Sequence, residues 1–240
     1  MIGWRARIGA VQPSRGDTFS YEFYKMAPDG VVLVMAVTNV RELTEAELER
    51  ALGEYEKASR ILATEEVDII LVAGIPLLAL KGGKGADIEI AKRIQEVTGI
   101  PAMHNLTAAV EALRKLNVRK LAVVTPYRDA VNLREKQIFE ANDFEVVNIK
   151  GLQIERNVEI AMTPPYAAYR LAKETFREAP DAEGIFISCG RWQTVSFIES
   201  LERDLKIPVV SSAQAVIWAA FSRTGVGESK PGFGQLMRTL

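Results

Sequence analysis

The sequence is poor in the residues that build metal and redox sites: its 240 residues include one cysteine, Cys189, and one histidine, His104. A single cysteine excludes an internal disulfide, a dithiol redox pair and a cysteine zinc cluster. A single histidine, followed by Asn105, excludes a multi-histidine metal site. We therefore expect no metal site in this protein.

The sequence also lacks an excess of charge of either sign and any long apolar segment. Lys and Arg number 30 and Asp and Glu number 31, so neither nucleic acid nor a membrane surface is an expected partner. No apolar run approaches the roughly 20 residues of a transmembrane helix. The first ten residues are not followed by a signal-peptide cleavage site. These features predict a cytoplasmic protein, either a monomer or a small homo-oligomer.

The sequence motifs of nucleotide-binding loops are absent as well. No G-x-G-x-x-G follows a predicted strand, and the P-loop motif does not occur. The segment KGGKGAD at 81–87 comes closest, but it lacks the Ser or Thr with which a P-loop holds magnesium. We therefore expect no nucleotide and no other cofactor.

What the sequence does contain is an alternation of short β-branched runs with helical patterns, which predicts an α/β fold with parallel strands. Apolar residues recur at helical spacing in 44–63 and 129–142, with Thr44 and Asp129 at the expected N-cap positions. The eight strands that we predict are 6–13, 31–38, 67–74, 100–105, 120–126, 144–151, 183–190 and 207–212.

A faint internal duplication runs through the chain. Three ordered matches at nearly equal spacing are difficult to obtain by chance, although each is weak alone because buried parallel strands are generally rich in Val and Ile. The sequence therefore predicts two similar four-stranded halves, residues 1–117 and 118–218, with residues 219–240 packing back on the first half. The matching segments are 7–14 and 119–127, 68–74 and 183–189, and 100–110 and 207–217.

The duplication pairs residues at the ends of predicted strands. It sets Pro13 opposite Pro126 and Gly74 opposite Cys189. Loops at the carboxyl ends of parallel strands are where α/β sheets bind ligands. If the two halves face each other, these loops converge on one cleft, which is the predicted site.

Cys189 is the first candidate for chemistry. It ends a predicted strand and precedes a predicted helix at 191–205, whose N-terminus would lower the pKa of the thiol and favour the thiolate. The alternative is a buried, inert cysteine, since free cysteines are commonly buried. The small neighbours Ser188 and Gly190 and the mirrored Gly74 favour a functional thiol.

Tyr127 is the second candidate. Because it directly follows a predicted strand, its phenol is expected to project over the strand ends and donate a hydrogen bond to a carboxylate or enediolate oxygen. A packing tyrosine is the alternative. The strand-end hydroxyls of Ser14, Thr125 and Ser212 are further candidates, although such residues commonly cap the following helix. His104 is expected to complete a strand or loop.

Several stretches resemble the arylmalonate decarboxylase and maleate cis-trans isomerase family of the aspartate/glutamate racemase superfamily. The most specific part is Ser-Cys-Gly at 188–190 followed by Ile-Pro-Val-Val-Ser-Ser at 207–212. The resemblance implies two pseudo-symmetric Rossmann-like halves, a site in the cleft between them and no cofactor. The stretches that carry it are 118–132, 178–190, 201–221 and 230–237.

The family resemblance also implies an activity. Its racemases and isomerases place one cysteine on each side of the substrate; Cys189 matches the second, and Gly74 stands at the position of the first, as in arylmalonate decarboxylase. One thiol can protonate one face of an enediolate, but it cannot be both acid and base of a two-faced racemisation. The implied function is a lyase that decarboxylates a small malonate-type acid, with Cys189 and Tyr127 catalytic. The predicted substrate-binding residues are Pro13, Ser14, Gly74, Ile75, Pro76, Thr125, Gly190 and Ser212.

The sequence departs from the family pattern directly after Gly74. Hydroxyl residues of the oxyanion pocket are expected there, but Ile75 and Pro76 stand in their place, and proline has no N–H. Losing one such donor typically costs ~3 kcal/mol of transition-state stabilisation. Two alternatives therefore stay open: an isomerase or racemase like maleate isomerase or the aspartate, glutamate and hydantoin racemases, and a carboxylate-binding protein without catalysis.

Overall fold

The computed structural model describes residues 2–13, 16–39, 45–75, 78 and 84–240 of the chain. Two four-stranded sheets form the framework, and every strand pair within them is parallel. The first sheet has the order β2-β1-β3-β4 and the second the order β6-β5-β7-β8. The identical order of the strands confirms the predicted pair of similar halves.

The eight predicted strands are all present, each one to four residues shorter than its predicted range. They are β1 (Ala6–Gln12), β2 (Val31–Val37), β3 (Ile69–Val72), β4 (Ala102–His104), β5 (Lys120–Thr125), β6 (Glu145–Gly151), β7 (Gly184–Ile187) and β8 (Val209–Ser211). Strands β3 and β7 are buried at every position. This explains their continuous apolar sequence, because a parallel strand covered on both faces has no solvent-facing side.

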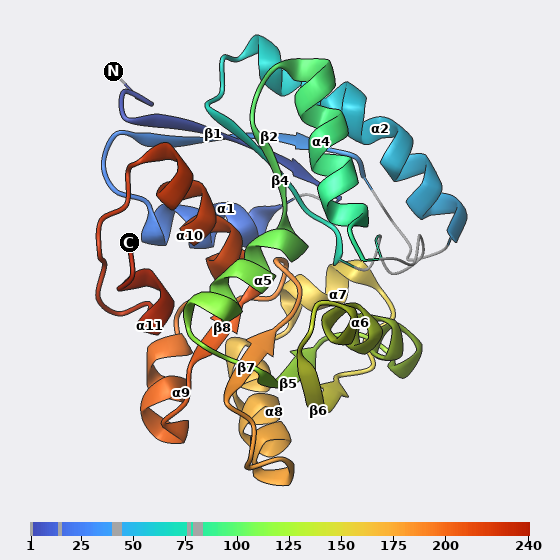
Figure 1. Ribbon diagram of the computed structural model, residues 1–240, viewed down its shortest axis with the longest axis vertical. Helices are drawn as coiled ribbons and strands as arrows, with labels where there is room; N and C mark the ends of the chain where they lie inside the picture. The colour runs from blue at the N-terminus through green and yellow to red at the C-terminus, as the bar shows by residue number, and fades with distance from the viewer. Residues whose placement is uncertain (1, 14–15, 40–44, 76–77, 79–83) are drawn as a thin grey trace.

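The helices that connect the strands lie on both faces of each sheet, as Figure 1 shows. Helices α2 and α4 pack on one face of the first sheet, and α10 packs against α1 and α5 on the other side. The helices are α1 (Asp17–Met26), α2 (Glu45–Thr64), α4 (Ala86–Thr98), α5 (Asn105–Lys115), α6 (Asp129–Ala141), α7 (Asn157–Met162), α8 (Pro165–Glu178), α9 (Ile198–Leu205), α10 (Ser212–Thr224) and α11 (Gly234–Met237).

Helix α10 joins the two halves. It follows the last strand of the second sheet, yet its residues from Ser212 to Phe221 are all buried, largely against α1 and α5 of the first half. Figure 1 shows α10 (red) beside α5 (green) between the two sheets. One continuous apolar core consequently includes residues of both halves, so the loops at the strand ends are held in a fixed relation.

The structure corrects three details of the sequence analysis. The helix predicted at 191–205 begins only at Ile198, because residues before it form turns whose N–H groups are bound elsewhere. Asp129 is the first residue of α6 and not its N-cap, which is Arg128. The predicted packing of 219–240 on the first half describes only part of that segment, since α11 contacts α9 and β8. Thr44 lies outside the described residues.

No helix in the described part of the chain is both long enough and apolar enough to cross a membrane.

Candidate active site

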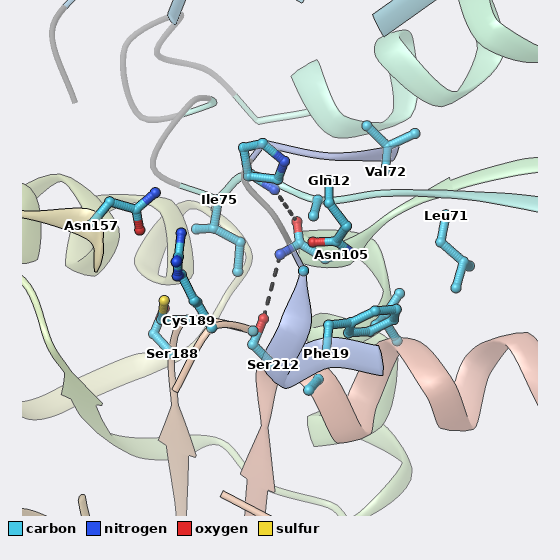
Figure 2. Close-up of a pocket in the computed structure, with 18 of the residues that line it drawn as sticks. Gln12, Phe19, Leu71, Val72, Ile75, Asn105, Asn157, Ser188, Cys189 and Ser212 are labelled. Atoms are coloured by element: carbon cyan, nitrogen blue, oxygen red, sulfur yellow. Dashed lines mark hydrogen bonds between the residues drawn. The ribbon is translucent and has the colours of Figure 1, made fainter. Parts of the chain in front are cut away.

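A cavity of about 80 Å³ lies where the carboxyl ends of the two sheets meet. Its lining comes from the ends of β1, β3, β5 and β7 and from the first turns of α5 and α10. Its lining includes Gln12, Phe19, Ile75, Asn105, Tyr127, Asn157, Ser188, Cys189, Gly190, Arg191 and Ser212. The predicted cleft is therefore present, and both halves contribute to it (Figure 2).

The structure brings most of the predicted site residues to this cavity. The predicted residues that line it are Pro13, Gly74, Ile75, Tyr127, Cys189, Gly190 and Ser212. Ser14 and Pro76 lie outside the described residues. Thr125 does not line the cavity: its hydroxyl is buried, donates to the side-chain oxygen of Asn132 at 2.5 Å and accepts from the N–H of Tyr127 at 3.0 Å. Thr125 thus shapes the turn that presents Tyr127.

The two mirrored positions of the duplication share an unusual backbone conformation. Gly74 after β3 has a φ of 135°, and Cys189 after β7 has a φ of 82°. Positive φ is freely available to glycine but costs other residues on the order of 1–3 kcal/mol. A cysteine held in a conformation that suits glycine, at the edge of a cavity, points to a functional reason for the side chain.

The state of the Cys189 thiol differs from the sequence prediction. Burial raises the pKa of Cys189, and the hydrogen bonds from the Tyr127 phenol and the Arg191 N–H offset only part of this rise. The predicted lowering by a helix N-terminus was wrong, because no helix begins within eight residues of the thiol. Cys189 is therefore a neutral thiol at pH 7, partly accessible from the cavity.

Tyr127 is buried beside this thiol. Desolvation raises the pKa of its phenol well above the usual value, and the neighbouring Cys189 raises it further. The phenol therefore keeps its proton across the physiological range and can act only as a neutral donor or acceptor. The predicted role of an oxyanion donor requires such a neutral phenol, and the role itself stays a prediction.

A hydrogen-bonded chain links the two halves across the cavity. Asn105, the first residue of α5, accepts from the N–H of Gly74 at 3.2 Å, and its amide donates to the Ser212 hydroxyl at 3.4 Å (Figure 2). Asn105 and Ser212 are equivalent positions in the duplication. Sequence reasoning chose Ser212 and missed Asn105, although the pairing of 100–110 with 207–217 could have identified it.

His104 precedes Asn105 and serves the fold. It is fully buried at the N-cap of α5, where its Nδ1 accepts from the N–H of Leu106 at 3.1 Å. Burial lowers its pKa to about 4, so the imidazole is neutral. His104 is the last residue of β4, so the prediction that it completes a strand or loop is confirmed.

Two buried carboxyl groups lie just behind the lining, and sequence reasoning missed both. Burial raises the pKa of Glu135 on α6 to about 7, and the nearby Ser188 hydroxyl lowers it by a smaller amount. Both oxygens of Glu135 are buried, and no residue that the structure describes forms a well-aligned hydrogen bond with them. Its charge acts on Tyr127 and Cys189, whose pKa values it raises.

The second buried carboxyl group, Glu22 on α1, holds the loop after Cys189. Its carboxylate accepts hydrogen bonds from the backbone N–H groups of Thr194 and Val195, the latter at 2.9 Å. Burial raises the pKa of Glu22 to about 7. Because α1 belongs to the first half and the loop to the second, this contact fixes the loop across the cleft and accounts for the late start of α9.

The comparison with known proteins accords with this geometry. The family model for arylmalonate decarboxylase matches residues 9–237. The chain belongs to the arylmalonate decarboxylase family. Arylmalonate decarboxylase of Bordetella bronchiseptica is 28% identical over 231 residues, which cover 95% of each chain. A maleate isomerase of Nocardia farcinica is 24% identical over 242 residues, which cover 97% of this chain and 95% of its own.

Solved structures of both kinds of enzyme in the arylmalonate decarboxylase family share the fold. A cysteine variant of arylmalonate decarboxylase in a sulfate-associated form aligns with a TM-score of 0.86 at 26% identity, covering 96% of this chain and 99% of its own. The maleate isomerase Iso from Pseudomonas putida S16 aligns with a TM-score of 0.91 at 23% identity, covering 97% and 98%. The identities to the two kinds of enzyme are too similar to distinguish between their activities.

Besides Asn105, the polar side chains of Gln12, Asn157 and Arg191 line the cavity and were not predicted as site residues. Arg191 is the one charged side chain among the described lining residues, and its Nε is buried without a hydrogen-bond partner. The sequence analysis missed Arg191 because it predicted a helix at 191–205, which gave no indication that the Arg191 side chain faces the cavity.

The described residues contain no cluster of three His, Cys, Asp or Glu side chains that could hold a metal ion.

Proposed function

We propose that this protein is a decarboxylase that needs no cofactor, acts on a small malonate-type carboxylic acid, and protonates the resulting enediolate with Cys189. The observation that carries the proposal is the asymmetry of the cavity: a thiol lines it at Cys189, and a glycine, Gly74, stands at the mirrored position. A substrate bound between them meets one proton-transfer group and not two. Decarboxylation with protonation from one side requires only one.

The proposed reaction has two steps. The bond between the α-carbon and one carboxylate breaks, carbon dioxide leaves, and the electron pair spreads over the α-carbon and the remaining carboxylate as an enediolate. The Cys189 thiol then gives its proton to the α-carbon, and the thiolate regains a proton from water. The donors available to the enediolate oxygens are the Tyr127 phenol, the Ser212 hydroxyl and the Gly190 N–H.

The protonation state of Cys189 favours this role over that of a nucleophile. A proton donor has to carry its proton before the reaction, whereas a nucleophilic cysteine acts as the thiolate. Burial raises the pKa of the thiol and keeps it protonated. Tyr127 lies close enough to hydrogen-bond the thiolate, which stabilises the thiolate that remains after proton transfer.

The second candidate is isomerisation of an unsaturated dicarboxylate. It is supported by Arg191 in the cavity, whose Nε has no hydrogen-bond partner among the described residues and which suits a substrate with a second carboxylate, and by the related maleate isomerases. It is opposed by the glycine at position 74, because the family resemblance assigns the nucleophile of the isomerases to that position.

Proton NMR in heavy water tests the two candidates in one experiment. The protein is incubated separately with substituted malonates and with maleate, and Cys189→Ala is the matched variant. We expect one malonate to lose carbon dioxide and gain a single deuteron at the α-carbon, with no turnover by Cys189→Ala. Conversion of maleate to fumarate without loss of carbon dioxide would replace the proposal with isomerisation, and binding of a malonate without turnover would leave a carboxylate-binding protein.

A further inference from the structure

The cavity described above has a chemically distinct side around Arg191. Most of its lining is apolar, including Phe19, Val72 and Ile75, and Arg191 is the one charged side chain among the described lining residues. Asn157, at the start of α7, also lines the cavity; Figure 2 shows it on the same side as Cys189, with Ile75 nearby. Besides the polar groups around Tyr127 and Ser212, the cavity therefore offers the amide of Asn157 and the cationic guanidinium of Arg191.

The guanidinium of Arg191 has no carboxylate partner in the described part of the chain. Its Nε is buried without a hydrogen bond, whereas Arg5, Arg93 and Arg223 each form an ion pair at the surface. Leaving a buried donor unpaired costs on the order of 1–3 kcal/mol, and more when the group is charged. A bound anion would remove this cost, and a planar guanidinium binds a carboxylate through two parallel hydrogen bonds.

The proposed reaction indicates which substrate group this anion is. The carboxylate that becomes the enediolate is placed near Tyr127 and Ser212. The carboxylate that leaves turns into neutral carbon dioxide, so a guanidinium bound to it would stabilise the starting state more than the transition state and slow the reaction. Arg191 is therefore not expected to bind either malonate carboxylate. The remaining part of the substrate that it could bind is the substituent on the α-carbon.

The size of the cavity limits this substituent. The cavity has to hold the whole substrate, so its volume of about 80 Å³ favours a small substituent beside the two malonate carboxylates. A short aliphatic substituent fits this space better than an aryl ring. Resting on the proposed function, we infer that the substrate carries a further carboxylate on a short aliphatic substituent, bound by Arg191 with help from Asn157. Substrates of this class are malonates with an acidic side chain.

Decarboxylation of two matched compounds tests the inference. Ethane-1,1,2-tricarboxylate carries the additional carboxylate and gives succinate, whereas methylmalonate lacks it and gives propionate. We expect the kcat/KM of the wild type for the tricarboxylate to exceed that for methylmalonate by at least 100-fold. Arg191→Met is expected to lose at least 100-fold on the tricarboxylate and little on methylmalonate. Arg134→Met, an exposed arginine on α6, is the control and is expected to match the wild type.

Binding of the two products separates failure of the inference from failure of the proposed function. By calorimetry, the wild type is expected to bind succinate at least tenfold more tightly than propionate, and Arg191→Met is expected to bind both alike. Equal turnover of both substrates, or equal binding of both products by the wild type, overturns the role of Arg191. Selective binding of succinate without turnover of either substrate supports the role of Arg191 and counts against the decarboxylase.

Discussion

Cys189 combines two properties that the fold does not require of it. Its backbone has a φ of 82°, which suits glycine, and its thiol is buried enough for its pKa to be raised. The mirrored position in the first half is occupied by a glycine with a φ of 135°. A residue that strains the backbone and still faces a cavity is expected to increase activity at the expense of stability.

Replacing Cys189 with glycine is predicted to abolish turnover and to give a more stable protein than replacing it with alanine. Cys189→Gly removes the strain at positive φ, whereas Cys189→Ala removes the thiol but keeps the strain. We expect the free energy of unfolding of the glycine variant to exceed that of the alanine variant by about 1 kcal/mol, measured by urea denaturation. Equal stability of the two variants would show that the positive φ carries no cost.

Tyr127→Phe is predicted to lower kcat by roughly 100-fold. The phenylalanine ring fills the same buried space but removes the proton that the phenol donates toward the enediolate, and loss of one such donor costs about 3 kcal/mol of transition-state stabilisation. Tyr166→Phe on α8, where the tyrosine is exposed, is the control and is expected to keep full activity. Steady-state kinetics measures the kcat of both variants, and circular dichroism checks that they are folded. An unchanged kcat for Tyr127→Phe would show that Tyr127 serves only in packing.

At the scale of elements, the site depends on a contact between α1 and the loop after β7. Glu22 on α1 accepts from the N–H groups of Thr194 and Val195, and the Thr194 hydroxyl lies 2.9 Å from the Ser211 hydroxyl. Glu22 belongs to the first half of the molecule, whereas Thr194, Val195 and Ser211 belong to the second. The loop that carries Cys189, Gly190 and Arg191 is therefore held from both sides of the cleft.

Glu22→Ala is predicted to destabilise the protein by about 3 kcal/mol, because it leaves two buried N–H groups without an acceptor. Glu22→Gln keeps a side-chain oxygen that can accept from both of these N–H groups. The Thr194 hydroxyl lies within 3.4 Å of the Glu22 carboxylate, so it can accept a hydrogen bond from the amide of the glutamine. We expect this variant to lose less than about 1 kcal/mol. Chemical denaturation of the two variants checks the difference, and equal losses would contradict the argument.

At the scale of the whole molecule, buried titratable groups make stability depend on pH. The pKa values of Glu22 and Glu135 rise to about 7 in the folded state, and that of His104 falls to about 4. A carboxyl group with a raised pKa stabilises the fold at low pH, and this contribution is lost as the pH rises from about 4.5 to 7. A histidine with a lowered pKa acts in the opposite direction between about 4 and 6.5.

Comparing the wild type with Glu135→Gln isolates one carboxyl group, because His104 and Glu22 are common to both proteins. The glutamine cannot ionise, so the stability of the wild type relative to this variant should fall by about 3 kcal/mol between pH 4.5 and 7.5. Urea unfolding across this range measures the change. Glu140→Gln, an exposed carboxylate on the same helix, is expected to show no such change, and a constant difference for Glu135→Gln would contradict the raised pKa.

The sequence alone determined the architecture, because its signals are local and repeated. Each buried strand is a short Val- and Ile-rich run, and the order of the matches between the halves predicted two equivalent sheets. It also placed Tyr127, Gly74, Cys189 and Ser212 at one cleft, since parallel strands present their carboxyl ends at one edge.

Only the tertiary structure decided the electrostatics of the site and the path of the loop after Cys189. Whether 191–197 is helical depends on Glu22, which is distant in sequence and takes the N–H groups of that loop. The pKa of Cys189 depends on burial by both halves and on Glu135 from α6, so the local pattern predicted the wrong direction. Arg191 was missed for the same reason. Only the tertiary structure shows that its side chain lines the cavity and that its Nε has no hydrogen-bond partner among the described residues.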